Sequence, residues 1–208
     1  MKPYYEHAGI TIYHGDCREI LPTLEPVDLV LTDPPYGIAK IWSAGSERHG
    51  WGKANKESAL RNQWDGAPPT QETLALVVAG GQRSIVWGGN YFHLPPSRRW
   101  LVWNKPERGF SLAEAELAWT NIDGVVRVFD HRRSDLGREH PTQKPLELMV
   151  WCINLASDIG ETILDPFMGS GTTLRAAKDL GRKAIGIELE ERYCEIAARR
   201  MQQEVLAL

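Results

Sequence analysis

Apolar and polar positions follow two repeating patterns along the chain. Short runs rich in β-branched and aromatic residues predict strands, and longer segments with an apolar position every three or four residues predict helices. In the first two thirds of the chain, strands are expected at 10–13, 27–32, 84–87, 100–103, 116–120 and 125–129, the last two joined by a turn at 121–124, and helices at 17–24 and 70–79. The segment 37–69 has neither pattern, so it is expected to be a functional loop or a mobile segment.

The last third of the chain has the clearest pattern. Leu146, Met149, Val150 and Ile153 recur at the spacing of one helical face. The elements that follow are a strand at 162–164, a glycine-rich turn, a helix ending at Leu180, a strand at 183–187 and a last helix over 193–201. A strand, a helix and a second strand in this order form a βαβ unit, so a mostly parallel sheet with right-handed crossovers is expected.

Composition is that of an ordinary globular protein. The 208 residues, 42% of them hydrophobic and 25% charged, predict a single domain spanning 1–208. No apolar run approaches the length of a membrane span, and the N-terminus has no secretory signal. The three cysteines, Cys17, Cys152 and Cys194, are far apart, so neither a disulfide framework nor a metal site is expected, and the cytoplasm is the expected location.

The net charge of −3 hides an uneven distribution. Residues 1–36 carry −4, residues 37–144 carry +4 and residues 145–208 carry −3. A basic middle could face the phosphates of a nucleic acid. On charge alone, a solvated charged face is the favoured interpretation.

Gly169, Ser170 and Gly171 lie where a predicted strand turns into a helix. Glycines at such a turn let a ligand approach the backbone, and Glu188, 17 positions after Gly171, ends the next strand near the usual distance of a ribose-binding acid. Leu174 replaces the third glycine of the dinucleotide motif, and no phosphate-binding Gly-Lys-Ser/Thr follows. The segment therefore predicts a site for one adenosine with a carboxylate tail; a tight turn beside a surface acid is the alternative.

Asp33, Pro34, Pro35 and Tyr36 directly follow the apolar strand at 27–32. The prolines stiffen the turn and have no N–H, so the segment gathers a carboxylate and fixed carbonyls beside an aromatic ring. Such a cluster suits an exocyclic amino group on a flat ring. A rigid turn with a packed tyrosine is the alternative.

Three motifs together resemble a known family. They are Asp33-Pro-Pro-Tyr-Gly37, His140-Pro-Thr-Gln-Lys-Pro145 and Leu164-Asp-Pro-Phe-Met-Gly-Ser-Gly-Thr-Thr173. In this order they resemble the circularly permuted β class of S-adenosylmethionine-dependent DNA amino-methyltransferases. The likeness covers 10–36 and 140–200, while the middle of the chain matches diffusely, through 88–91 and 103–106.

The resemblance implies a fold and a cofactor site. The fold would be α/β, a Rossmann-like sheet of seven mostly parallel strands, one of them reversed, with helices on both faces. Glu188 would bind the ribose of S-adenosylmethionine, Asp16 its adenine, and Thr142 and Lys144 would lie near its carboxylate. The full set of implied cofactor-binding residues is Asp16, Cys17, Asp33, His140, Thr142, Lys144, Asp165, Phe167, Gly169, Ser170, Gly171, Thr172 and Glu188.

The resemblance also implies a reaction on a base flipped out of DNA. The candidate catalytic residues are Asp33, Pro34, Pro35 and Tyr36: Asp33 and the Pro34 carbonyl would accept hydrogen bonds from the amino group of the base, and Tyr36 would stack on its ring. In this family an aspartate at the first motif position usually goes with adenine N6 and a serine with cytosine N4. Adenine is therefore expected, with cytosine as the alternative.

DNA contacts are expected from basic side chains in two loop insertions, at about 38–65 and 130–139. The candidates are Lys40, Arg48, Lys53, Lys56, Arg61, Arg132, Arg133 and Arg138. Little chain remains for a separate recognition domain, so a short or relaxed recognition sequence is expected, as in phage-like forms in a bacterial host. Members of this class often pair, which makes a homodimer a further expectation.

Two rival interpretations remain open. RNA or protein amino-methyltransferases typically have asparagine at the position of Asp33 and carry the cofactor loop first in the chain, and this sequence differs in both respects. The other rival is a catalytically silent nucleic-acid-binding module with the same fold, against which the intact motif residues argue.

Overall fold

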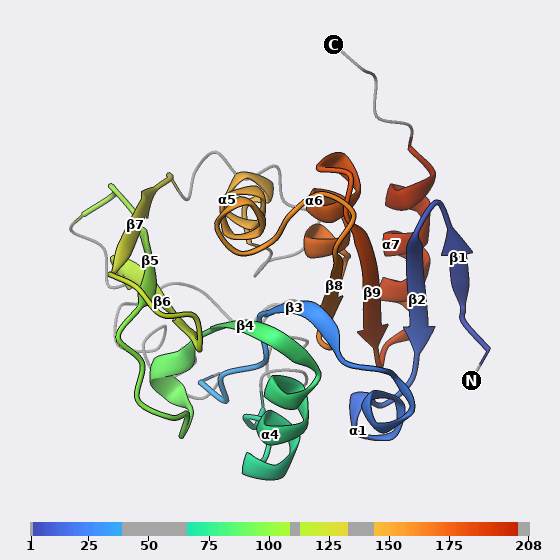
Figure 1. The fold of residues 1–208 in the computed structure, drawn as a ribbon, viewed down its shortest axis with the longest axis horizontal. Coiled ribbons are helices and arrows are strands. Elements are labelled where there is room, and N and C mark those ends of the chain that lie inside the picture. The colour runs from blue at the N-terminus through green and yellow to red at the C-terminus, as the bar shows by residue number, and fades with distance from the viewer. Residues whose placement is uncertain (1, 39–65, 109–112, 133–143, 204–208) are drawn as a thin grey trace, which may run out of the picture.

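The computed structural model describes residues 2–38, 66–108, 113–132 and 144–203. Within them the strands form one sheet of nine, in the order β1-β2-β9-β8-β3-β4-β6-β5-β7 (Figure 1). The strands are β1 (Tyr5–His7), β2 (Ile10–His14), β3 (Val27–Thr32), β4 (Gly81–Trp87), β5 (Trp100–Asn104), β6 (Ala115–Thr120), β7 (Arg127–Asp130), β8 (Thr162–Asp165) and β9 (Lys183–Glu188). The mostly parallel α/β sheet expected from the sequence is confirmed.

The described sheet has two strands more than the seven expected, and two of its strands, β1 and β6, are reversed rather than one. β1 pairs with β2 through a two-residue turn in which Ala8 and Gly9 have φ angles of 49° and 79°. Positive φ at both positions is the geometry of a tight hairpin turn. This short edge strand has no apolar alternation, which is why the sequence pattern missed it.

The turn at 121–124 does not join a hairpin. β6 pairs with β4 and β5, whereas β7 pairs in parallel with the far side of β5. Between β6 and β7 the chain therefore crosses from one side of β5 to the other. Strand order at this end of the sheet could not be inferred from the local pattern, because it depends on pairings between strands that are distant in sequence.

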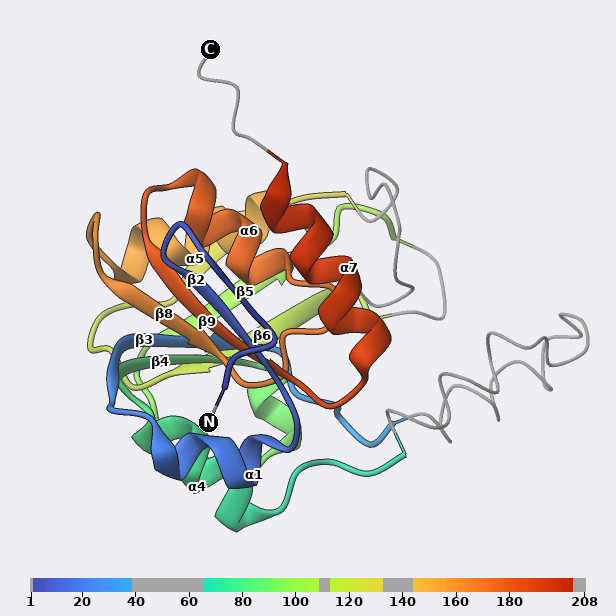
Figure 2. The same cartoon turned by 90° about the vertical axis from the view of Figure 1, so that its right-hand side faces the viewer.

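Helices cover both faces of the sheet (Figure 2). One face carries α5 (Leu146–Ala156), α6 (Thr172–Asp179) and α7 (Glu191–Gln202), and the other carries α1 (Cys17–Ile20) and α4 (Gln71–Ala79). Two short 3₁₀ turns, η1 (Leu21–Thr23) and η2 (Gly89–Tyr91), complete the described elements. None of the helices in the described ranges combines the length and the apolar character that crossing a membrane requires.

The core explains why β3 is apolar at successive positions. Leu29 and Leu31 pack into the cluster beneath α5 and α6, while Val30 packs into the cluster on the opposite face with Val77 and Leu164. A central parallel strand is buried on both faces, so it shows a continuous apolar run. The run ends at Thr32, where the chain leaves the sheet at its carboxyl edge.

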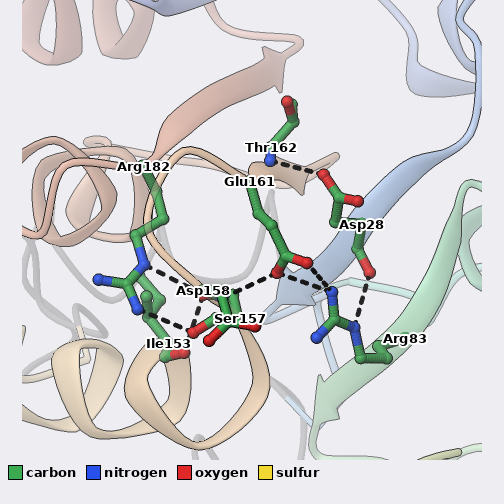
Figure 3. A network of polar contacts seen from close by, with 8 residues as sticks. All are labelled: Asp28, Arg83, Ile153, Ser157, Asp158, Glu161, Thr162 and Arg182. Atoms are coloured by element: carbon green, nitrogen blue, oxygen red, sulfur yellow. Dashed lines mark hydrogen bonds and ion pairs between the residues drawn. The ribbon is translucent and has the colours of Figure 1, made fainter.

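A polar network ties the sheet together at the opposite edge (Figure 3). The Arg83 guanidinium donates to both carboxylate oxygens of Glu161 at 2.7 Å and to the carbonyl of Asp28 at 3.2 Å. The Asp28 carboxylate accepts from the Thr162 amide at 2.8 Å. These bonds link the amino ends of β3, β4 and β8, so they fix the relative positions of the strands whose carboxyl ends carry the predicted site.

Candidate active site

The predicted site segments follow four neighbouring strands. β2, β9, β8 and β3 lie side by side and run in the same direction. Asp16 follows β2, Glu188 ends β9, Asp165 ends β8 and Asp33 follows β3. The carboxyl ends of parallel strands are where open α/β sheets bind ligands, and the fold brings all four acids to that edge.

Both oxygens of the Asp33 carboxylate are engaged. The Tyr36 hydroxyl donates to Oδ1 at 2.5 Å, and the Lys144 ammonium donates to Oδ2 at 2.5 Å and to the Tyr36 oxygen at 3.0 Å. Burial raises the pKa of Asp33, and the Lys144 ammonium opposes that rise. Burial and the nearby Asp33 charge raise the pKa of Tyr36 well above its ordinary value, so its hydroxyl stays protonated and donates.

The Tyr36 ring is held in place by its neighbours. It stacks on Tyr91 with a centroid distance of 5.0 Å and an interplanar angle of 18°, and it meets the edge of Phe92. A Cβ atom at Gly88 would lie 2.1 Å from the ring of Tyr36, and Gly88 has a φ of 71°. Only glycine allows the ring to lie here. Tyr91 was not among the expected site residues, although 88–91 was a diffuse match in the sequence.

Lys144 lies within a row of alternating charges. Besides Asp33, its ammonium lies 3.1 Å from Oε2 of Glu116, and the other oxygen of Glu116 forms an ion pair with Lys105. Lys144 was expected beside the cofactor's carboxylate; in the described structure its partners come from the Asp-Pro-Pro-Tyr segment and β6. Sequence reasoning missed Glu116 and Lys105, and the only available signal was Lys105 within the diffuse match at 103–106.

The charges in this row shift one another's pKa values. Burial raises the pKa of Glu116, but Lys144 and Lys105 outweigh it and lower the value to about 2. Burial lowers the pKa of Lys144, but Asp33 and Glu116 outweigh it and raise the value. Glu116 is therefore a carboxylate and Lys144 an ammonium at neutral pH.

Asp165 is buried at the end of β8. Its Oδ1 accepts from the Thr32 hydroxyl at 2.7 Å and from the Phe167 amide at 3.2 Å. Burial raises the pKa of this carboxyl to about 6. Phe167 is half-buried, while Thr172, the first residue of α6, is buried. The pair of Thr32 and Asp165 joins β3 to β8 directly below the site.

The glycine loop contains two different kinds of glycine. At Gly169, with a φ of 51°, an added Cβ would meet nothing within 4 Å, and its amide donates to Glu188 at 3.0 Å. At Gly171, with a φ of 80°, an added Cβ would lie 2.8 Å from the Cβ of Ala197 on α7. Ser170 is buried and accepts from Arg200, also on α7. Gly171 and Ser170 therefore serve the packing of α7, and open space adjoins Gly169.

Glu188 and Asp16 are both held by local bonds. The second oxygen of Glu188 accepts from the Glu190 amide at 2.8 Å, and burial raises the pKa of its carboxyl. Asp16 caps α1 and pairs with Arg18, whose hydrogen bond lowers the pKa of Asp16. The thiol of Cys17 is buried, which raises its pKa to about 11.

Several expected residues lie outside the described part of the chain. They are His140, Thr142, Lys40, Arg48, Lys53, Lys56, Arg61, Arg133 and Arg138. Arg132 is described and exposed, just beyond β7. Within the described ranges, no three His, Cys, Asp or Glu side chains group in a way that could hold a metal ion.

The chain is similar to known proteins in sequence and in fold. A family described as DNA methylase, of the N6/N4 type, matches residues 95–199. The Type II methyltransferase M2.DpnII of Streptococcus pneumoniae is 50% identical over 252 aligned residues, covering 98% of this chain and 93% of that protein. The crystal structure of M1.HpyAVI superposes with a TM-score of 0.60 at 23% identity, covering 94% of this chain and all of that one. The cytosine-N4-specific PvuII DNA methyltransferase superposes with a TM-score of 0.66 at 16% identity, covering 99% and 91%.

Proposed function

Because the chain belongs to the N6/N4 family of DNA methylases, we propose that it transfers a methyl group from S-adenosylmethionine to the N6 amino group of adenine in DNA. One observation carries the proposal. A half-buried carboxylate, Asp33, lies beside the aromatic ring of Tyr36 at the end of β3, next to the strand that leads into the glycine loop. Hydrogen-bond acceptors, a flat ring and an adjacent adenosine site are the parts that this reaction requires.

The residues around the glycine loop fit S-adenosylmethionine. The open space at Gly169 lets a ligand approach the backbone, and the Glu188 carboxylate is fixed beside it by two amides. A carboxylate at this place accepts hydrogen bonds from ribose hydroxyls. We assign Asp165, Phe167, Gly169 and Glu188 to the cofactor site, with Ser170, Gly171 and Thr172 as its supporting turn, and Asp16 and Cys17 at its far side. When bound, S-adenosylmethionine supplies an electrophilic methyl group on a sulfonium.

Asp33 would act as a hydrogen-bond acceptor for the amino group of the flipped base. A carboxylate offers about four lone-pair positions, and Tyr36 and Lys144 use two of them, so capacity remains for an N–H group. A second N–H would be accepted by the Pro34 carbonyl, held by the rigid Pro34–Pro35 turn. These bonds localise the nitrogen lone pair, which is otherwise delocalised into the ring, and direct it toward the methyl group. Catalysis then consists of positioning and fixed electrostatics, without a covalent enzyme intermediate.

Tyr36 would provide the surface for the base ring. Its hydroxyl is anchored on Asp33 and its ring is supported by Tyr91 and Gly88, so its orientation is fixed before the base arrives. A pre-oriented aromatic surface lowers the entropic cost of binding an extruded base. The choice of adenine follows from the aspartate at position 33, and cytosine N4 is the alternative because the same acceptors suit both amino groups.

The proposal is tested by incubating the purified chain with radiolabelled S-adenosylmethionine and unmethylated genomic DNA, followed by digestion and nucleoside chromatography. Label in N6-methyladenine is the expected result. Label in N4-methylcytosine would overturn the choice of base and keep the reaction. Cofactor binding without label in DNA, RNA or protein would favour the silent binding module. Activity is also expected to fall steeply with salt, because basic side chains such as Arg132 would contact phosphates.

A further inference from the structure

We infer that Lys105 and Glu116 are positioning residues of the proposed methyltransferase, which hold the Lys144 ammonium on the Asp33 carboxylate. The inference rests on the proposed function for its role in catalysis, but the coupling itself is a property of the chain. Neither residue lies in the Asp-Pro-Pro-Tyr segment or the glycine loop. Lys105 directly follows β5 and Glu116 belongs to β6, in the middle of the chain where the family match is only diffuse.

The geometry is a continuous row of four alternating charges. Lys105 pairs with one oxygen of Glu116, Lys144 lies 3.1 Å from the other, and Lys144 reaches Asp33 at 2.5 Å. The side chains of Lys105 and Lys144 retain only 6% and 8% of their exposure, so water screens these charges weakly. A lysine has three rotatable donors, and with partners on two sides its ammonium is confined to one place.

Lys105 and Lys144 are also restrained by aromatic rings. The Lys105 ammonium lies 4.3 Å from the ring centroid of Trp103, and the Lys144 ammonium lies 5.4 Å from that of Tyr36 and 5.9 Å from that of Trp87. These rings belong to β5, β4 and the Asp-Pro-Pro-Tyr segment. Rings from β4 and from the Asp-Pro-Pro-Tyr segment thus restrain Lys144, the cation that sets how strongly Asp33 can accept another hydrogen bond, and a ring from β5 restrains Lys105.

The charges around Asp33 determine the sign of each expected effect. The titratable groups that influence Asp33 come from four places: Lys144 before α5, Glu116 in β6, Asp165 at the end of β8, and Tyr36 in the same segment as Asp33. Lys105 influences Asp33 through its ion pair with Glu116. Removing the negative charge of Glu116 lowers the pKa of Asp33, because a like charge that raises it is gone. Removing the positive charge of Lys105 raises the pKa of Asp33, because Glu116 is then less compensated.

Three variants of the full chain test this coupling: Glu116→Gln, Lys105→Met and the double variant. The first measurement is the ¹³C titration of the Asp33 carboxyl by NMR, assigned with Asp33→Asn, which needs no activity. The titration midpoint is expected to fall in Glu116→Gln and rise in Lys105→Met. In the double variant, which removes one charge of each sign, it should return toward the wild-type value. Glu114→Gln serves as the matched control, because Glu114 is exposed and directly precedes β6.

The second measurement is the pH dependence of methyl transfer. The acid limb of the rate profile should move in the same direction as the titration midpoint of Asp33. The kcat of each single variant should fall by about 10- to 100-fold, the range for a misplaced reacting group, while KM for DNA stays nearly unchanged.

Titration midpoints that stay at the wild-type value in both single variants, with the native fold retained, overturn the inference. Shifted midpoints with no methylation of any DNA by the wild-type chain uphold the coupling and refute the proposed function instead. An acid limb that stays fixed while the midpoints move refutes the positioning role.

Discussion

The Lys144 ammonium lies 2.5 Å from Oδ2 of Asp33, so the first residue of the Asp-Pro-Pro-Tyr segment forms an ion pair with a buried lysine. The pair spans 111 positions of the chain. Lysine at this place orients the carboxylate and opposes the rise in its pKa that burial causes, and Tyr36 fixes its other oxygen at 2.5 Å. Asp33 is thus a pre-positioned acceptor, which is how a site gains from fixed electrostatics rather than from reorganisation during the reaction.

Asp33→Asn is expected to abolish methyl transfer. The amide keeps the shape but replaces one acceptor with a donor, and it leaves Lys144 facing a neutral group. We expect a loss of at least about 100-fold in single-turnover rate, the scale for one removed electrostatic contact. Binding of S-adenosylmethionine, measured by calorimetry, should change only a few-fold. Asp123→Asn, at an exposed position, is the control; a near-normal rate in Asp33→Asn would refute the assigned role.

Lys144→Met is expected to destabilise the fold. The substitution removes the cation shared by Asp33 and Glu116. Removing one partner of a buried ion pair lowers the free energy of unfolding by about 3 kcal/mol or more. The low end of that range is expected because the Asp33 side chain keeps 28% exposure. Without Lys144 the pKa of Asp33 rises further above its unfolded value. The stability that Lys144→Met loses relative to the wild-type chain should therefore increase as pH rises and decrease in acid.

Urea denaturation at pH 5 and pH 8 measures this effect. Adding Asp33→Asn to Lys144→Met should recover part of the lost stability at pH 8, because the uncompensated charge is removed. Equal stabilities of Lys144→Met and the wild-type chain at both pH values would show that the ion pair contributes nothing to folding.

The two glycines of the loop are expected to respond differently to alanine. Gly171→Ala places a Cβ atom 2.8 Å from the Cβ of Ala197 and forces alanine to adopt a φ of 80°. The free energy of unfolding should therefore fall by about 1–3 kcal/mol. Gly169→Ala meets no atom within 4 Å and bears only the strain of its φ of 51°. It should weaken binding of S-adenosylmethionine more than it lowers stability.

Thermal melts and cofactor titrations on the two variants separate these effects. A larger stability loss in Gly169→Ala than in Gly171→Ala would contradict the packing described for α7. Unchanged cofactor affinity in Gly169→Ala would exclude this glycine from the cofactor site.

The sequence predicted strands and helices correctly where the burial of one or both faces produces a hydrophobic pattern within a short segment. The run at 27–32 and the helix at 70–79 match β3 and α4, whose start is capped by Thr70. The helix expected at 17–24 is divided into α1 and η1, because Pro22 does not donate an amide. The strand order was not readable, since β7 reaches its place beyond β5 through contacts distant in sequence.

The same distinction holds for the site. Asp33, Gly169 and Glu188 follow strand ends, so their gathering at one edge could be inferred from the order of elements alone. Glu116 reaches the site because β6 inserts between β4 and β5, whereas Tyr91 follows β4, the neighbour of β3. Glu116 has no local signal, since a glutamate in a strand is common, and Tyr91 had only the diffuse match at 88–91. The role of Glu116 follows from strand pairing, which propensity does not encode.

Asp165→Asn is expected to stabilise the fold at neutral pH. Burial raises the pKa of Asp165 to about 6, above the value of about 3.9 in an unfolded chain, so the folded state binds this proton more tightly. The resulting stability is fully present below about pH 4 and is lost as pH rises through 6. An asparagine still accepts from Thr32 and Phe167 through its oxygen and bears no charge. The variant should therefore exceed the wild-type chain by about 1–3 kcal/mol at pH 7.5 and match it near pH 4. Denaturant melts across this range, with the exposed Asp123→Asn as control, check the slope; parallel curves for Asp165→Asn and the wild-type chain would refute it.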